Sequence, residues 1–123
     1  MTQTAPTGYK EFSRNGSDSV TFIRSGHTTS APRLAIFDRK VPVANGNGFS
    51  VPQYRFRLID GHVDAEGVPL KERSIIEVIV RHPVGIDATS ITTALADASA
   101  IVGDAEFVND ALVDLMFPKE PAV

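Results

Sequence analysis

The hydrophobic pattern of this chain changes its period once, close to Asp87. Before that point, apolar residues alternate with polar ones as in strands, most clearly in "SIIEVIVRH", Ser74 to His82. After it, apolar residues are spaced four, three and four apart, which makes one face of a helix. These residues are Ile91, Leu95, Ala98 and Val102. A run of strands followed by helices predicts an α+β fold with an antiparallel sheet, because βαβ units would interleave the two.

The N-terminal part of the sequence predicts a hairpin and three long strands. The hairpin covers residues 11–24 and turns at Asn15-Gly16, a dipeptide that favours tight hairpin turns. The long strands cover residues 33–41, 53–60 and 74–82. Two more Asn-Gly pairs separate the first of these from the second. A long loop over residues 60–73, with two glycines and a proline, separates the second from the third.

Two helices are expected after the last strand. Asp87 is placed to cap the first and Gly103 to end it, since those residue types are favoured at helix ends. Asp104 is placed to cap the second, which Pro118 ends. The residues expected to pack these helices, within a dimer, are Ile91, Leu95, Val102, Phe107, Leu112 and Leu115.

This layout leaves much of the sheet without cover. We expect a single domain, residues 1–123, in which residues 1–82 form the hairpin and sheet and residues 83–123 form the helices. Two short helices cover one face incompletely, so the other face is either solvated or occupied by a partner. Helices that cross onto a second copy would complete the cover, which favours an obligate dimer.

The strand "QYRFRLIDG", Gln53 to Gly61, has an apolar face and an arginine-bearing face. The apolar side chains are Tyr54, Phe56 and Leu58. If the long strands are neighbours, the second face could gather five arginines and one aromatic residue: Arg33, Arg39, Arg55, Arg57, Arg81 and Phe37. Guanidinium groups suit phosphates, and an aromatic ring can stack on a base. The open alternative is an ordinary solvated face, with Glu77 as a neutralising neighbour.

Charge is divided unevenly along the chain. Residues 1–81 hold eleven of the twelve basic residues and eight acids, a net charge of +3. Residues 82–123 hold one lysine and seven acids, a net charge of −6. Such asymmetry indicates an interaction surface on the basic half, although solvated acids on a helical tail would give the same numbers.

The sequence carries no common catalytic or metal-binding signature. It has no cysteine, which excludes disulfides, thiolate metal sites and cysteine nucleophiles. The three histidines, His27, His62 and His82, lack metal-ligand spacing, and the acids between Asp60 and Glu66 fall short of a calcium loop. We therefore expect no enzyme, no metal and no cofactor. We also expect no membrane segment, because no apolar run approaches about 20 residues, and no signal peptide.

Two segments carry a resemblance to a known family. They are "IIEVIVRHPVGIDATSITTALADASAIV", Ile75 to Val102, and the strand "YRFRLIDG" before its loop. With the order of elements over nearly the whole chain, they resemble the coat proteins of levivirus-like single-stranded RNA bacteriophages. The resemblance implies a homodimer whose sheets join edge to edge and whose helices cross onto the partner. It further implies an icosahedral shell in the virion, assembled in the bacterial host cytoplasm.

The same resemblance implies partners and sites. The sheet faces inward onto single-stranded genomic RNA, and the RNA-contacting stretches supply Arg33, Arg39, Arg55, Arg57 and Arg81. Loop residues at the symmetry axes of the shell are Asp60, Gly61, His62, Gly67 and Pro69. A minor maturation protein is a further expected partner. The last strand has no aromatic residue, unlike several relatives that stack a base there, and Phe37 is the candidate substitute.

Two other functions stay open from the sequence. One is a dimeric single-stranded RNA-binding protein that does not assemble. The other is an enzyme or small-ligand binder that uses the open sheet face.

Overall fold

The computed structural model describes residues 3–121, which form two compact units. The first unit ends at Val84 and contains all the strands; the second begins at Gly85 and contains the helices. The predicted fold class is confirmed, because an antiparallel sheet precedes two helices without interleaving.

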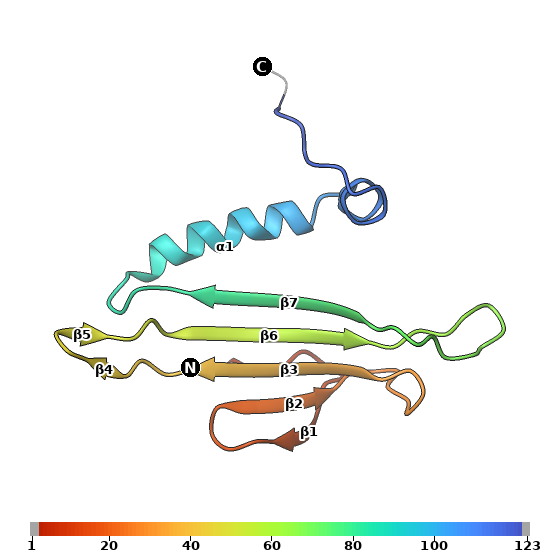
Figure 1. Ribbon diagram of the computed structural model, residues 1–123, viewed down its shortest axis with the longest axis horizontal. Helices are drawn as coiled ribbons and strands as arrows, with labels where there is room; N and C mark the ends of the chain where they lie inside the picture. The colour runs from red at the N-terminus through yellow and green to blue at the C-terminus, as the bar shows by residue number, and fades with distance from the viewer. Residues whose placement is uncertain (1–2, 122–123) are drawn as a thin grey trace. The chain divides into compact units, whose positions relative to one another are not determined.

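The first unit is built on one five-stranded antiparallel sheet (Figure 1). Its strands are β1 (Lys10–Arg14), β2 (Ser19–Ile23), β3 (Arg33–Lys40), β6 (Gln53–Asp60) and β7 (Ser74–Arg81). They lie in the order β1-β2-β3-β6-β7, so β7 is an edge strand. The three long strands are rich in β-branched and aromatic residues, which fit a pleated surface.

Asn-Gly pairs make two of the turns, as the sequence predicts. Gly16 has φ +69° between β1 and β2, and the Asn15 amide donates to the Ser19 carbonyl at 3.0 Å. Between β3 and β6, Gly46 has φ +62° in a small separate hairpin of β4 (Ala44–Asn45) and β5 (Gly48–Phe49). Figure 1 shows this hairpin at one end of the sheet and the β6–β7 loop at the other.

The predicted long loop is present between β6 and β7 and is held by its own backbone. Val63 and Pro69 form an isolated antiparallel bridge. The Asp64 carboxylate accepts hydrogen bonds from the Glu66 and Val68 amides, both at 2.9 Å. Asp64 therefore satisfies the backbone of a tight turn, a usual task for this residue type.

The second unit begins with α1 (Ala88–Val102), whose two ends are confirmed. The Asp87 side chain accepts a hydrogen bond from the Ser90 amide at 2.9 Å, which lowers the pKa of Asp87. Gly103 follows the helix, and its amide donates to the Ser99 carbonyl at 2.9 Å. A Cβ at residue 103 would lie 2.9 Å from that carbonyl oxygen, so the close turn requires glycine.

The second helix differs from the prediction in type and length. It is a π-helix, η1 (Phe107–Val113), with Glu106 as its N-cap residue. The Asp104 carboxylate accepts from the Glu106 amide instead of capping the helix. Leu115 lies beyond the helix with φ +56°. A residue in the left-handed conformation does not continue a right-handed helix, so no regular helix reaches Pro118.

Little of the chain is buried. Ala35 in β3 is fully buried, and no other apolar side chain among residues 3–121 is buried except Pro32. On the edge strand β7, Ile75 and Ile76 point to opposite faces and are 63% and 56% exposed. α1 and η1 have no buried residue. A single copy thus presents much of its apolar surface to solvent, which is typical of a chain that assembles.

Candidate nucleic-acid interface

The register between β3 and β6 decides which side chains share a face of the sheet. Arg33 pairs with Asp60, and Phe37 pairs with Phe56. Residues directly opposite each other lie on one face. Odd-numbered residues of β3 therefore share a face with even-numbered residues of β6. Odd-numbered residues of β6, among them Arg55, lie on the other face.

We call the two surfaces the aromatic face and the arginine face. The aromatic face carries Phe22, Phe37, Phe56, Tyr54, Leu58, Val78 and Val80. The charged residues of the arginine face are Lys10, Asp38, Lys40, Arg55, Arg57, Glu77 and Arg81. Five basic residues and two acids give the strands of the arginine face a net charge of +3.

The predicted RNA-binding residues therefore do not share one surface. They divide into Arg55, Arg57 and Arg81 on the arginine face and Arg33, Phe37 and Arg39 on the aromatic face. The prediction assigned side chains to faces within each strand separately, and the sequence does not give the register that relates the faces of neighbouring strands. Which faces of two neighbouring strands coincide depends on their register, and a change of one residue exchanges the two faces of a strand. The observed register of β3 against β6 places the two groups on opposite faces.

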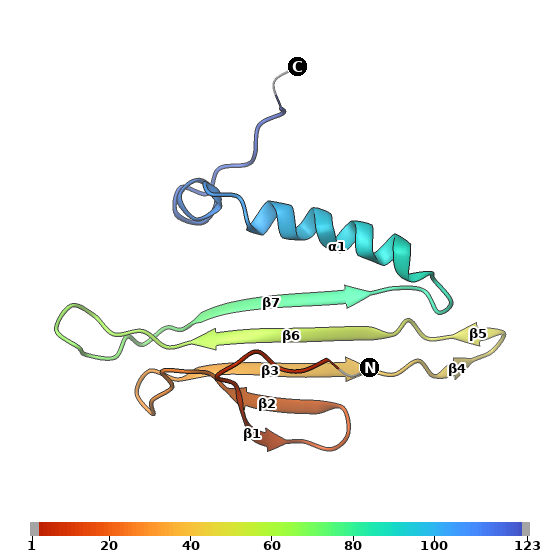
Figure 2. The ribbon, with the colours of Figure 1, turned by 180° about the vertical axis from the view of Figure 1, so that it is seen from behind.

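On the aromatic face, Phe37 lies in the middle of a row of rings. Its ring centroid is 5.6 Å from that of Phe22 and 6.0 Å from that of Phe56. Tyr9 continues the row, 6.2 Å from Phe22, in an N-terminal segment that crosses over β3 in Figure 2. Aromatic pairs at these separations stabilise a fold beyond their buried area. Phe37 is therefore part of the packing of this face.

The two predicted RNA-binding arginines on the aromatic face are held at its ends. Arg39 donates to the Asp18 carboxylate at 3.0 Å and to the Ser17 carbonyl at 2.8 Å. Arg33 donates to the Ser25 carbonyl at 3.0 Å and pairs with Asp60 at 3.4 Å. Both side chains thus tie strand ends to the adjacent turns.

On the arginine face, Asp38 and Glu77 hold the two central arginines. The Asp38 carboxylate accepts from Arg55 Nη2 at 3.0 Å and Nε at 3.2 Å, and its Oδ2 lies 3.5 Å from Arg57 Nη2. Glu77 accepts from Arg55 Nη1 at 3.3 Å. Ser19 donates to the other oxygen of Asp38 at 2.7 Å. These groups form a network across four neighbouring strands.

The network changes the acidity of its central carboxyl. Partial burial raises the pKa of Asp38, but hydrogen bonds from Ser19 and Arg55 and the charges of Arg55 and Arg57 outweigh it. The pKa of Asp38 therefore lies below its ordinary value. Sequence reasoning missed Asp38 because its position beside Arg55 depends on the register of β3 against β6.

Some guanidinium N–H groups on the arginine face are not used by this network. Arg57 Nε is buried and has no hydrogen-bond partner among the described residues. Arg81 donates through Nε to the Gln53 side chain at 2.8 Å, which orients its guanidinium at the end of β7. The arginine face can therefore offer positioned guanidinium groups to anions, although two of its cations already contact carboxylates.

The predicted axis-loop residues fall into two groups. Asp60 and Gly61 belong to the end of the sheet, where Asp60 accepts from Arg24 at 2.6 Å and the Gly61 amide donates to the Pro32 carbonyl at 2.7 Å. His62, Gly67 and Pro69 lie in the loop that extends beyond the sheet end (Figure 1). Within it, the His62 ring nitrogen Nε2 lies 2.6 Å from the Ser74 hydroxyl.

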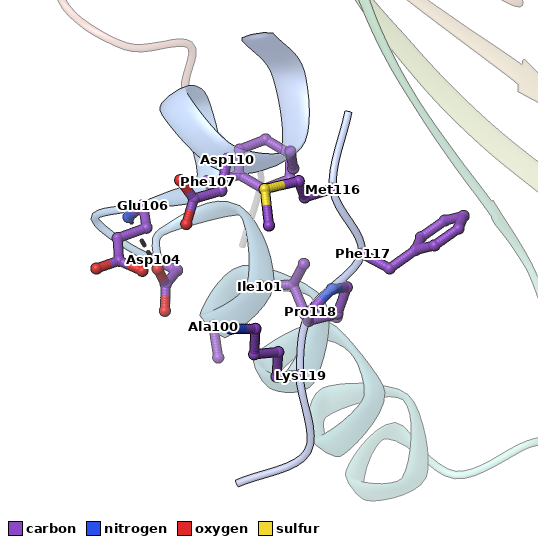
Figure 3. Close-up of a pocket in the computed structure, with 11 residues that line it drawn as sticks. Ala100, Ile101, Asp104, Glu106, Phe107, Asp110, Met116, Phe117, Pro118 and Lys119 are labelled. Carbon is purple, nitrogen blue, oxygen red and sulfur yellow. Dashed lines mark hydrogen bonds between the residues drawn. The ribbon is translucent and has the colours of Figure 1, made fainter. Parts of the chain in front are cut away.

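The predicted helix-packing residues are mostly exposed in one copy of the chain. Ile91 and Phe107 are half-buried. The other four, Leu95, Val102, Leu112 and Leu115, are exposed. The second unit has a hollow of about 610 Å³. Figure 3 shows residues that line it, among them the apolar Ile101, Phe107 and Met116, with acids beside them.

Two further features bear on function. Among residues 3–121, no group of three or more His, Asp or Glu side chains is placed to hold a metal ion. Within the same residues, no helix has the length and apolar character needed to cross a membrane.

Comparison with known proteins gives matches in structure alone. No protein-family model and no curated protein matches the sequence. A chain of the virus-like particle of Wenzhou levi-like virus 4 superposes with a TM-score of 0.79 at 18% identity, over 98% of this chain and 93% of that one. A chain of the virus-like particle of Beihai levi-like virus 32 superposes with a TM-score of 0.76 at 15% identity, over 96% of this chain and 94% of that one.

A third match extends the comparison to a named bacteriophage. For the virus-like particle of bacteriophage GQ-907 the TM-score is 0.71 at 12% identity, over 97% of this chain and 88% of that one. The likeness to levivirus-like coat proteins is thus confirmed at the level of the fold, and this chain has the fold of chains that form virus-like particles of levi-like viruses and bacteriophages.

Proposed function

We propose that this chain is the coat protein of a levivirus-like bacteriophage, whose copies assemble into an icosahedral shell around single-stranded RNA. The observation that carries the proposal is the match in fold with particle-forming chains over at least 96% of this chain in the three cases above. A structural role also accounts for the exposed apolar surface, which an isolated monomer would not tolerate well.

The building block in this proposal is a homodimer. Two β7 edges pair antiparallel, so that the two sheets become one, and the helices of each copy cross onto the other. Support comes from β7 itself, which is an edge strand with exposed isoleucines on both faces. An edge strand with exposed apolar side chains on both faces is a template for pairing with another strand. Exposed Leu95 and Leu112 would gain cover from the partner.

The arginine face is the proposed RNA side, with Arg55, Arg57 and Arg81 as phosphate contacts. Its net charge of +3 supports this assignment, and the negatively charged second unit favours the outer side. The aromatic face is then the side of the sheet away from the RNA. Each copy contributes a few contacts, and many copies in one shell make the attraction to RNA multivalent and sensitive to salt.

The proposal also covers the contacts made by the β6–β7 loop and the site of assembly. The β6–β7 loop, which contains His62, Gly67 and Pro69, is proposed to contact neighbouring copies at the symmetry axes. The protein is proposed to assemble in the bacterial host cytoplasm and to reside in the virion, where a maturation protein would be a minor component.

Expression in bacteria, followed by size-exclusion chromatography and electron microscopy, tests the proposal. The expected product is a population of hollow particles, on the order of tens of nanometres wide for a shell of many such domains, with nuclease-protected RNA inside. A homogeneous dimer without particles would contradict the coat-protein role. RNA bound to that dimer would favour a non-assembling RNA-binding protein, and empty particles would contradict only the RNA side of the proposal.

A further inference from the structure

The two carboxylates that contact Arg55 are held very differently. Asp38 accepts from Ser19, from two nitrogens of Arg55 and lies near Arg57, and its side chain is 22% exposed. Glu77 accepts one hydrogen bond, from Arg55 Nη1 at 3.3 Å, and its side chain is 39% exposed. Asp38 is therefore fixed by several contacts, whereas Glu77 has one long contact on the solvent side.

We propose that Glu77 is a displaceable counter-ion of Arg55, and that an RNA phosphate takes its place at Nη1 while Asp38 stays. This inference rests on the proposed RNA side of the sheet and deepens it by naming the group that the RNA must displace. Phosphate oxygens and carboxylates accept the same charge-assisted hydrogen bonds from guanidinium, so the two compete for one donor.

The geometry of the guanidinium explains why Glu77 gives way. Asp38 occupies the edge of Arg55 that is made of Nε and Nη2, and this grip fixes the plane of the group. Nη1 is the remaining nitrogen, and Glu77 alone contacts it among the described residues. Replacing one exposed carboxylate costs little, because exposed ion pairs contribute weakly to stability. Glu77 thus lowers RNA affinity in the free protein without blocking the site.

The inference predicts that Glu77→Gln binds RNA more tightly. The affinity of the unassembled full-length chain for a fluorescent single-stranded RNA should rise about two- to five-fold, the range that an exposed ion pair supplies. Fluorescence anisotropy at about 50 to 200 mM salt measures it, where phosphate contacts dominate. The matched control is Glu72→Gln, which makes the same charge change in the β6–β7 loop and should raise affinity less.

A double-mutant cycle with Arg55→Ala makes the test specific. If Glu77 acts through Arg55, Glu77→Gln in the Arg55→Ala background should raise affinity no more than Glu72→Gln does. A full gain in that background, or equal gains for the two glutamine variants, would overturn the inference. Chains that bind no RNA with or without Glu77 would instead contradict the proposed RNA side. Far-ultraviolet circular dichroism of each variant confirms that the sheet is intact.

Discussion

Asp38 on β3 and Arg55 on β6 are direct cross-strand partners, and Asp38 Oδ2 accepts from Arg55 Nη2 at 3.0 Å. This pair lies at the centre of the arginine face, where a surface that only binds phosphate would hold no acid. The carboxylate contributes in two ways: it stabilises the sheet at neutral pH and it fixes the direction of the arginine.

Acid should weaken the fold through Asp38. Because the pKa of Asp38 is lowered in the folded chain, its contribution is present above the ordinary pKa, about 3.9, and is lost as pH falls through the lower folded value. Denaturant unfolding followed between neutral pH and that acidic window should show the loss. Asp38→Asn should be less stable at neutral pH and should lose less stability on acidification. An unchanged pH profile would contradict the role of this pair.

Removing the two central arginines should reduce packaged RNA and leave shells formed. For Arg55→Ala combined with Arg57→Ala, the slope of log affinity against log salt should become shallower by about 1.4, at about 0.7 per lost contact with single-stranded RNA. The ratio of ultraviolet absorbance of nucleic acid to protein in purified particles provides a second measure.

The control for that variant is Arg39→Ala, which removes an arginine from the aromatic face. Because Arg39 contacts Asp18 and the Ser17 carbonyl, its loss should affect the β1–β2 turn and leave the salt slope unchanged. Equal slopes for the double variant and the wild-type chain would refute the assignment of the arginine face to RNA.

Phe37 should matter for stability and not for RNA. Phe37→Ala should lower the free energy of unfolding by about 3 kcal/mol, the low end for a buried phenylalanine, since Phe37 is half-buried between two rings. Phe37→Leu should recover part of the loss. The RNA content of particles made with Phe37→Leu should equal that of the wild type; a marked decrease would restore the base-stacking hypothesis.

Leu95 tests whether a partner covers the helix. In one copy its side chain is 45% exposed, so truncation to alanine should cost little unless a second copy buries it. In the assembled protein we expect a loss of about 2–5 kcal/mol, measured by denaturant unfolding. Val113→Ala, at a position that is 69% exposed, is the comparison. If both variants unfold like the wild type, the helices do not pack in the proposed way.

The parts of the fold that depend on nearby residues were predictable from the sequence. Asp87, Gly103 and the Asn15-Gly16 turn act within a few residues, through capping and backbone conformation, and the structure has them where they were expected. The strand segments followed from alternation alone.

The composition of the site was less predictable, because it depends on long-range register. Alternation places Arg55 and Tyr54 on opposite faces of one strand. It cannot say whether Phe37, on another strand, shares the face of Arg55 or the face of Tyr54. The pairing of β3 with β6 settles this across a twelve-residue connection that contains its own hairpin. The second helix differed from the prediction in type and length. Apolar spacing suggested an α-helix as far as Pro118, whereas the chain forms the shorter π-helix η1 and has a left-handed residue at Leu115.

The two-sided exposure of β7 also has a consequence for how the protein is made. A newly released copy carries isoleucines on both faces of an unpaired edge, and such an edge joins any available strand. Correct pairing is second order in chain concentration, whereas loss of single copies to proteolysis is first order. The yield of folded protein should therefore rise more steeply than the rate of translation, so that the first copies synthesised in a cell are the ones most often lost.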